Sequence, residues 1–90
     1  MEIIYSLQAL EDIEYWKKSG NKAIMNKITS LLEDIAEHPF TGTGKPEPLK
    51  YDLAGYWSRR INSEHRIIYS VHEDIIEIYV LSMRYHYSKK

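Results

Sequence analysis

The chain of 90 residues has the length of one small domain, with 43% hydrophobic residues, 28% charged residues and a formal net charge of −1. Because it contains no cysteine, a disulfide framework and a thiolate metal site are both excluded. No run approaches the roughly 20 apolar residues of a membrane helix, and the first residues lack the basic start and apolar run of a signal peptide. We therefore expect a single domain over residues 1–90, located in the cytoplasm and not associated with membranes.

The charge is divided unevenly along the chain. Residues 1–39 hold four lysines against seven acidic residues, a balance of −3, and residues 40–90 hold eight basic against six acidic residues, a balance of +2. We place the candidate chemistry in the more basic second half. Two net positive charges neutralise few phosphates, so the affinity for free RNA should be modest, and an RNA substrate would need something else to hold it in place.

The first half of the chain predicts one strand and two helices. Residues 2–5 are typical of a short strand, and Ser6 can cap a helix whose apolar residues recur at helical spacing up to the break at residues 19–20. Asn21 can cap a second helix, whose apolar stripe ends before Pro39. Two amphipathic helices joined by a glycine turn should pack as a hairpin.

The second half predicts a loop followed by strands. Residues 40–48 show neither a helical nor a strand period and are interrupted by glycine and proline, which is typical of a loop. Three strand-like runs follow at residues 56–62, 65–71 and 75–83, and we expect a further short strand around residues 49–53. Short turns between the runs indicate antiparallel neighbours. The expected fold is α+β in the order β-α-α-β-β-β-β, with both helices on one face of an antiparallel sheet.

Three residues of this half match the needs of metal-free RNA cleavage. That reaction needs a base near the ribose 2′-OH, an acid near the departing 5′ oxygen and positive charge around the phosphorane, and Glu47, His86 and Arg66 offer these functions. Glu47 lies between two prolines that stiffen its segment. Strand alternation puts Arg59 and Arg60 on opposite faces, and we expect Arg60 to share the side of Arg66, because the neighbours of Arg59 have the character of core residues.

The run Arg84-Tyr85-His86-Tyr87 follows the last expected strand and carries unusual chemistry for a chain end. A guanidinium can hold a phosphate, an imidazole can transfer a proton near neutral pH, and phenols can stack on bases or form hydrogen bonds. Each candidate also has a plain structural reading. Glu47 would then be a solvated loop carboxylate, Arg66 a solvent-facing strand residue and His86 part of a frayed chain end.

The other histidines give no sign of a metal site. His38 ends the second expected helix, where a cation suits the helix dipole, and His65 and His72 flank a strand as turn residues. No spacing typical of metal ligands is present. We therefore expect no metal and no cofactor.

Several segments closely resemble one known family. They are residues 39–42, 44–50, 55–61, 64–69 and 84–87. These segments are similar to the YoeB toxins (Txe/YoeB family) of the RelE superfamily, and the similarity extends over nearly the whole chain. The resemblance implies a RelE-like fold and a toxin of a bacterial type II toxin–antitoxin system, acting as an endoribonuclease that cleaves mRNA in the ribosomal A site and inhibits translation. It also implies a cognate antitoxin of the YefM type and a toxin homodimer.

The resemblance further implies roles for individual residues. Glu47 is similar to the family's general base and His86 to its general acid. Arg66 corresponds to the arginine that stabilises the scissile phosphate, and Tyr87 matches the terminal tyrosine that orients the substrate. Two positions match RNA-contacting residues of the family, and two more belong to the chain end. The expected RNA-binding set is Lys50, Arg60, Arg84 and Tyr85.

Two further functions stay open for this fold. A ParE-like member of the same superfamily would bind DNA gyrase without a nuclease site, and a non-catalytic RNA-binding module would use aromatic residues of its strands. The joint presence of the four candidate catalytic residues favours the ribonuclease over the gyrase binder. The strand aromatics lack the spacing expected of an RNA-binding sheet. A toxin-like chain that has lost its activity is a third alternative.

Overall fold

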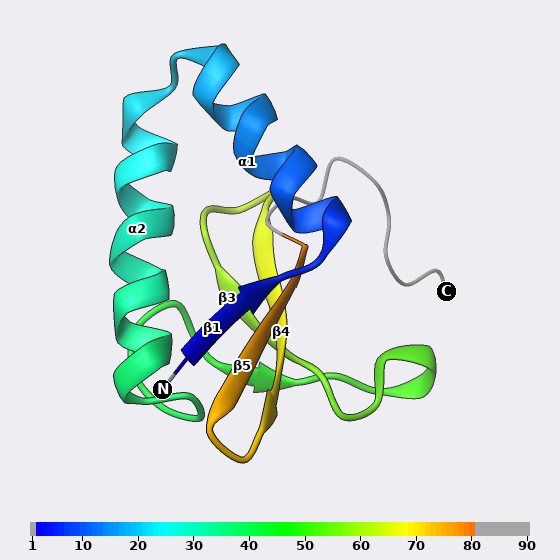
Figure 1. Cartoon of the computed structure of the whole chain (residues 1–90). Coiled ribbons are helices and arrows are strands. Elements are labelled where there is room, and N and C mark those ends of the chain that lie inside the picture. Colours follow the sequence, from blue (N-terminus) through cyan, green and yellow to red (C-terminus); the bar gives the residue numbers. More distant parts are fainter. Residues whose placement is uncertain (1, 81–90) are drawn as a thin grey trace.

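The computed structural model describes residues 2–80 (Figure 1). Its elements are, in chain order, β1 (Glu2–Tyr5), α1 (Leu7–Ser19), α2 (Lys22–Glu37), β2 (Glu47–Pro48), the 3-10 turn η1 (Tyr51–Leu53), β3 (Trp57–Arg60), β4 (Arg66–His72) and β5 (Ile75–Val80). The strands form one sheet in the order β1-β5-β4-β3-β2, and both helices cover the same face of it. The expected α+β fold is confirmed. No helix within residues 2–80 is both long enough and apolar enough to cross a membrane.

One strand runs in a direction that the sequence did not indicate. β1 pairs in parallel with β5, with Glu2 opposite Ile75 and Tyr5 opposite Ile78, whereas the other strand pairs are antiparallel. Parallel neighbours need a long connection, and the two helices and three strands between β1 and β5 supply one. The sheet is therefore mostly antiparallel, with one parallel pair at its edge.

The prediction of a strand around residues 49–53 is wrong. The short strand β2 comes earlier, at Glu47–Pro48, and Tyr51–Leu53 form a 3-10 turn. The physical reason is the backbone of Tyr51, whose φ of 59° lies in the left-handed region and cannot continue a strand. The end of the last expected strand, residues 81–83, lies outside the described residues.

Both helices begin at the caps that the sequence indicates. The Ser6 hydroxyl accepts a hydrogen bond from the Ala9 amide at 3.0 Å, and the Asn21 side-chain oxygen accepts one from the Ile24 amide at 3.1 Å. Gly20 ends α1 in the left-handed conformation, with φ 72°. The hairpin of α1 and α2 therefore starts and turns at residues that can be read directly from the sequence.

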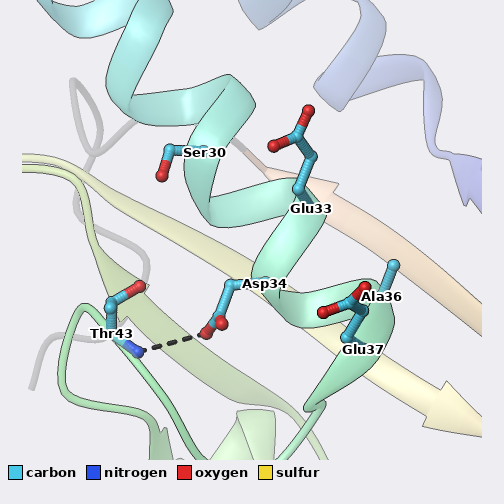
Figure 2. Close-up of a pocket in the computed structure, with 6 residues that line it drawn as sticks. All are labelled: Ser30, Glu33, Asp34, Ala36, Glu37 and Thr43. Atoms are coloured by element: carbon cyan, nitrogen blue, oxygen red, sulfur yellow. Dashed lines mark hydrogen bonds between the residues drawn. The ribbon is translucent and has the colours of Figure 1, made fainter.

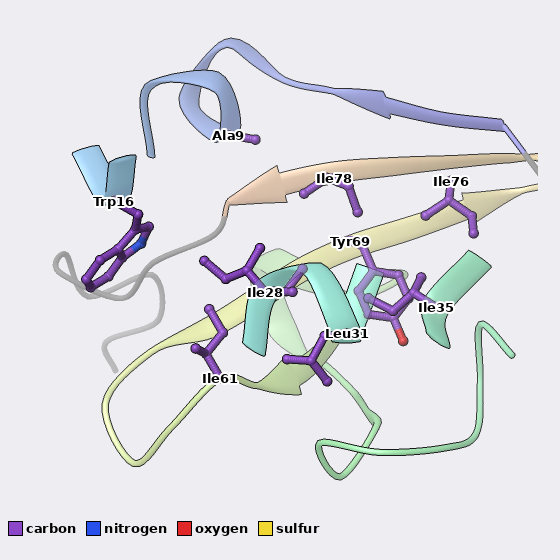
Figure 3. Packing of buried hydrophobic residues seen from close by; sticks show 10 residues of the cluster. Ala9, Trp16, Ile28, Leu31, Ile35, Ile61, Tyr69, Ile76 and Ile78 are labelled. Carbon is purple, nitrogen blue, oxygen red and sulfur yellow. The ribbon is translucent and has the colours of Figure 1, made fainter. Parts of the chain in front are cut away.

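The core lies between the helices and the sheet (Figure 3). Its helical side includes Ile28, Leu31 and Ile35 of α2, and its sheet side includes Ile67, Tyr69, Ile76 and Ile78. All of these side chains are at most 5% exposed. Full burial of one such aliphatic side chain stabilises a fold by about 1.5–3 kcal/mol. Ile76 and Ile78 are two residues apart on β5, and both belong to this layer, as the alternation of a strand requires.

One charged side chain lies inside this layer. Arg59, on the helix-facing side of β3, has 0% exposure. Its guanidinium donates five hydrogen bonds, to the Tyr69 hydroxyl, the Asp34 carboxylate and the carbonyls of His38, Thr41 and Thr43. Since a guanidinium has five N–H donors, every donor has a partner. An unpaired buried charge would cost several kcal/mol, so Arg59 requires all of these partners together.

The acidic partner lies at the last turn of α2. An Nη1 atom of Arg59 donates to Asp34 Oδ2 at 2.6 Å, and the same oxygen accepts from the Thr43 amide at 3.1 Å. The hydrogen bond from Arg59 holds the pKa of Asp34 below its usual value of 3.8. Burial raises the pKa of the Tyr69 hydroxyl, which stays protonated and donates to the Pro39 carbonyl at 2.7 Å.

These contacts fix the loop that follows α2. Gly42 lies so close to Asp34 that a Cβ atom there would be 2.1 Å from the carboxylate oxygen, and its φ of 117° also favours glycine. Two residues later, the Gly44 carbonyl accepts from the Arg60 amide at 2.7 Å, and Glu47 then pairs with Ser58. The path of residues 38–44 therefore determines where β2 joins the sheet.

Asp34→Asn should lower the free energy of unfolding at pH 7, and the loss should shrink in acid. Because the folded pKa of Asp34 lies below 3.8, its ionised form stabilises the fold above that pH, and the contribution is lost as the pH falls toward the folded pKa. We expect a loss of about 2–4 kcal/mol at pH 7, measured by urea unfolding of both proteins at pH 7 and at pH 3. Glu33→Gln, which removes an exposed carboxylate of the same helix, should change little. An equal loss at both pH values would contradict the ion pair.

Gly42→Ala should destabilise the protein more than Gly20→Ala. Both glycines have positive φ, so both variants suffer backbone strain of about 1–2 kcal/mol. At Gly20 nothing lies within 4 Å of the added Cβ atom, whereas at Gly42 the atom meets Asp34. We expect Gly42→Ala to cost about 1–2 kcal/mol more in thermal or urea unfolding, because the loop must shift. Equal losses at the two sites would mean that the loop does not depend on this close approach.

Candidate active site

Glu47, Arg60 and Arg66 share the face of the sheet that lies opposite the helices. Register pairs Glu47 with Ser58 and Arg60 with Arg66, and directly paired residues of neighbouring strands point to the same side. Ser58 and Arg60 are two residues apart on β3, so they also share that side. Arg59, between them, points toward the helices. The sequence-based expectation that Arg60 and not Arg59 lies with Arg66 is confirmed.

Strand spacing sets the distance between the two main candidates. Glu47 and Arg66 lie on β2 and β4, with β3 between them. Strands about 4.8 Å apart and an offset of two residues along the strand put their Cα atoms on the order of 12 Å apart. Among the ion pairs within residues 2–80, none joins these two side chains. The arrangement leaves room for a phosphodiester group between a carboxylate and a guanidinium.

The surroundings of Glu47 are open and basic. Glu47, Lys50 and Arg60 are exposed, and Arg66 is half-buried. β2 is an edge strand of two residues, where Pro48 can be accommodated although it has no N–H for the ladder. Pro46 restricts the backbone on the other side of Glu47. A carboxylate on a stiff edge with cations nearby is suited to accept a proton next to a bound phosphate.

Four predicted site residues cannot be placed. Arg84, Tyr85, His86 and Tyr87 lie outside the described residues. The structure therefore brings together Glu47 and the arginines of β3 and β4. The roles of the four terminal residues stay predictions.

A shallow hollow on α2 belongs to a different part of the molecule (Figure 2). It is lined by Ser30, Glu33, Asp34, Ala36, Glu37 and Thr43. Three of these side chains are carboxylates, whose charge repels a phosphate backbone. Figure 2 shows the Thr43 amide donating to Asp34 across this hollow, so these two residues hold the loop that follows α2. We do not place RNA here.

The histidines within residues 2–80 are spread over the fold. His38 caps α2 through its amide, which donates to the Asp34 carbonyl at 2.7 Å. The His65 ring packs edge-on against Trp16, with ring centroids 4.9 Å apart. His72, expected in a turn, is instead the last residue of β4, and its Nε2 lies 2.9 Å from the Ser70 hydroxyl. Within this described range, no three side chains of the metal-binding types gather into a site.

The sequence reasoning missed the residues that hold the site in place. Alternation did assign Arg59 to the helix-facing side, but it gave no partner for the buried charge. Asp34 is 25 positions away, and neither local period nor spacing connects the two. The sequence also predicts a strand at Tyr51, where the structure has a 3-10 turn. The 90% exposure of Tyr51 follows from the turn that replaces that strand.

Known proteins with similar sequences are toxins. The family described as the YoeB-like toxin of bacterial type II toxin–antitoxin systems matches residues 5–87. Toxin YoeB of Escherichia coli K12 is 45% identical over 87 residues, which cover 97% of this chain and 100% of the relative. A toxin of Streptomyces coelicolor with the same name is also 45% identical over 87 residues, with the same coverage.

Solved structures of this kind superpose closely. A YoeB/ParE toxin from Agrobacterium tumefaciens has a TM-score of 0.87 at 39% identity, covering 94% of this chain and 100% of the other. The YoeB–YefM toxin–antitoxin complex and the YoeB dimer of Staphylococcus aureus each give a TM-score of 0.83 at 43% identity, covering 97% of this chain and 98% of the other. Sequence and fold agree over nearly the full length. The chain belongs to the YoeB-like toxins of bacterial type II toxin–antitoxin systems.

Proposed function

We propose that this toxin is a metal-independent endoribonuclease that cleaves mRNA in the ribosomal A site and so inhibits translation. The observation that carries the proposal is the shared, helix-free face of Glu47, Arg60 and Arg66. An exposed carboxylate and two cations on one face of the sheet can supply a base and charge stabilisation for cleavage by the ribose 2′-OH. Membership in the toxin family supports the same reading.

In the proposed reaction, Glu47 accepts the proton of the 2′-OH, and the 2′ oxygen attacks the adjacent phosphorus. Arg66 stabilises the additional negative charge of the phosphorane. The bond from phosphorus to the 5′ oxygen then breaks, and His86 gives that oxygen a proton while Tyr87 orients the substrate. The products are a 2′,3′-cyclic phosphate and a 5′-OH. The parts given to His86 and Tyr87 rest on sequence resemblance.

The ribosome supplies the positioning that the toxin lacks. The basic half of the chain has a balance of only +2, which can hold few phosphates on its own. Lys50 and Arg60, with Arg84 and Tyr85 of the chain end, would contact the RNA once the ribosome presents it. Fixing the reacting groups in one geometry is a large part of catalysis. This substrate also places the toxin in the cytoplasm, where translation takes place.

The partners follow from the relatives. The S. aureus structures contain a YoeB–YefM complex and a YoeB dimer. We propose a cognate antitoxin of the YefM type and a homodimer for this chain as well. An antitoxin segment with net negative charge would complement the more basic second half of the toxin.

Glu47→Gln and Arg66→Gln should each reduce cleavage by about 10²–10⁴-fold, because they remove the proposed base and the phosphate clamp. Glu47 is exposed and Arg66 is half-buried, and neither belongs to an ion pair within residues 2–80, so the thermal unfolding midpoint should change little. Cleavage is measured by primer extension on a translated message. Glu64→Gln, an exposed carboxylate in the turn before β4, serves as the control and should cleave normally. Normal cleavage by a folded Glu47→Gln variant would exclude Glu47 as the base.

Cleavage should persist after chelation, and its products should identify the nucleophile. Attack by the 2′-OH leaves a 2′,3′-cyclic or 3′ phosphate and a 5′-OH, whereas metal-activated water leaves a 3′-OH. The assay uses programmed ribosomes, and their integrity at each chelator concentration is checked by sedimentation. A message with a 2′-deoxy nucleotide at the cleaved position should resist cutting. A 3′-OH product, or cutting of the 2′-deoxy message, would overturn the mechanism.

A further inference from the structure

The turn that joins β2 to β3 presents an aromatic ring to solvent. Tyr51 is 90% exposed, the largest exposed fraction among the large hydrophobic side chains within residues 2–80. Figure 1 shows this turn projecting from the body of the protein, away from α2. A single exposed apolar residue is common on protein surfaces, so exposure alone says little. The backbone and the neighbours of Tyr51 give it more meaning.

The backbone of Tyr51 is strained and firmly held. Its φ of 59° lies in the left-handed region, which is unfavourable for a residue with a Cβ atom and a ring. The turn is closed by hydrogen bonds from the Leu53 amide to the Lys50 carbonyl at 3.1 Å and from the Ala54 amide to the Tyr51 carbonyl at 3.0 Å. Strain that persists in a well-bonded turn is typical of functional positions. Asparagine or glycine would adopt this conformation at lower cost.

The turn follows the proposed base within a few residues of the chain. Tyr51 is four positions after Glu47 in the chain, so their Cα atoms lie within about 14 Å of one another. Lys50, next to Tyr51, is exposed and carries a charge that suits a phosphate. The exposed leucines at the start of α1, Leu7 and Leu10, have no cation next to them in the sequence, where Leu10 is followed by Glu11. Tyr51 therefore combines an exposed ring, a fixed backbone and an adjacent cation.

We propose that Tyr51 is a stacking platform for a nucleobase of the RNA, one or two nucleotides away from the cleaved bond. The proposal rests on the proposed ribonuclease function. Every base has a flat π face, so stacking on an exposed ring holds a single strand without reading its sequence. Lys50 would neutralise the adjoining phosphate. Tyr51 is a positioning residue, because it acts by holding the strand while Glu47 and Arg66 act on the reacting group.

The test replaces Tyr51 by residues that separate stability from stacking. Tyr51→Asn removes the ring but tolerates the left-handed backbone, so its unfolding midpoint should equal or exceed that of the wild type. Its kcat/KM on programmed ribosomes should nevertheless fall by about 10-fold, in line with the loss of one base stack. Tyr51→Trp should keep at least half of the wild-type value. Leu7→Ala, which removes another highly exposed side chain, should cleave normally.

A second arm identifies the base. Cleavage by the wild type and by Tyr51→Asn is compared on a series of messages, each with one abasic nucleotide at a different position beside the cleaved bond. At one position, the missing base should slow the wild type about 10-fold and leave Tyr51→Asn unchanged, because the ring and the base act as a pair. Normal cleavage by Tyr51→Asn would overturn the inference. Equal slowing of both proteins at every abasic position would also overturn the inference. If Tyr51→Asn also shifts toward monomer in sedimentation, Tyr51 joins two copies of the chain and does not bind a base.

These results are distinguishable from a failure of the proposed function. If the wild type cuts the message and Glu47→Gln does not, the ribonuclease assignment holds whatever Tyr51 does. If the wild type leaves translated messages intact, the ribonuclease assignment fails, and the stacking proposal fails with it.

Discussion

A buried guanidinium ties together segments that are far apart in the sequence. Arg59 lies between the helices and the sheet, and its five hydrogen bonds reach the end of α2, the loop after it and the Tyr69 hydroxyl of β4. A lysine could not replace it, because a compact ammonium has three donors and no planar fork. If one partner is lost, a charge stays buried with its hydrogen bonds incomplete. The loop therefore has one well-defined path, and that path leads to β2.

Strand β3 carries Arg59 and also residues of the proposed active site. On β3, Arg59 points toward the helices, and its neighbours Ser58 and Arg60 point to the opposite face, where Ser58 is buried and Arg60 is exposed. The Arg60 amide bonds to the Gly44 carbonyl, and Ser58 pairs with Glu47. A disturbance of Arg59 would therefore also move Glu47, which pairs with Ser58 on the other side of β3. The buried contacts of Arg59 stabilise the fold, and the neighbouring residues of β3, whose side chains point to the other side of the sheet, position the site.

The parts of the fold that follow local rules could be predicted from the sequence. Ser6 and Asn21 cap the helices, and alternation assigns Arg60 to the side of Arg66. The parallel direction of β1 could not be predicted, because it depends on which strand lies beside it after the chain has folded. The sequence predicts a strand at Tyr51, but the hydrogen bonds that close the turn hold its backbone in the left-handed region. The sequence also does not indicate that Asp34 is the partner of Arg59, because only tertiary packing brings these two residues together.

Native-state amide hydrogen exchange on Arg59→Lys tests most directly whether the guanidinium positions the edge that carries Glu47. If it does, the amides that join β2 and its loop to β3, those of Leu49 and Arg60, should lose most of their protection, while amides of the β4–β5 pair stay protected. Wild-type protection of Leu49 and Arg60 in this variant would contradict the account. So would an equal loss of protection throughout the sheet, because Arg59 would then support overall stability without a specific hold on the site.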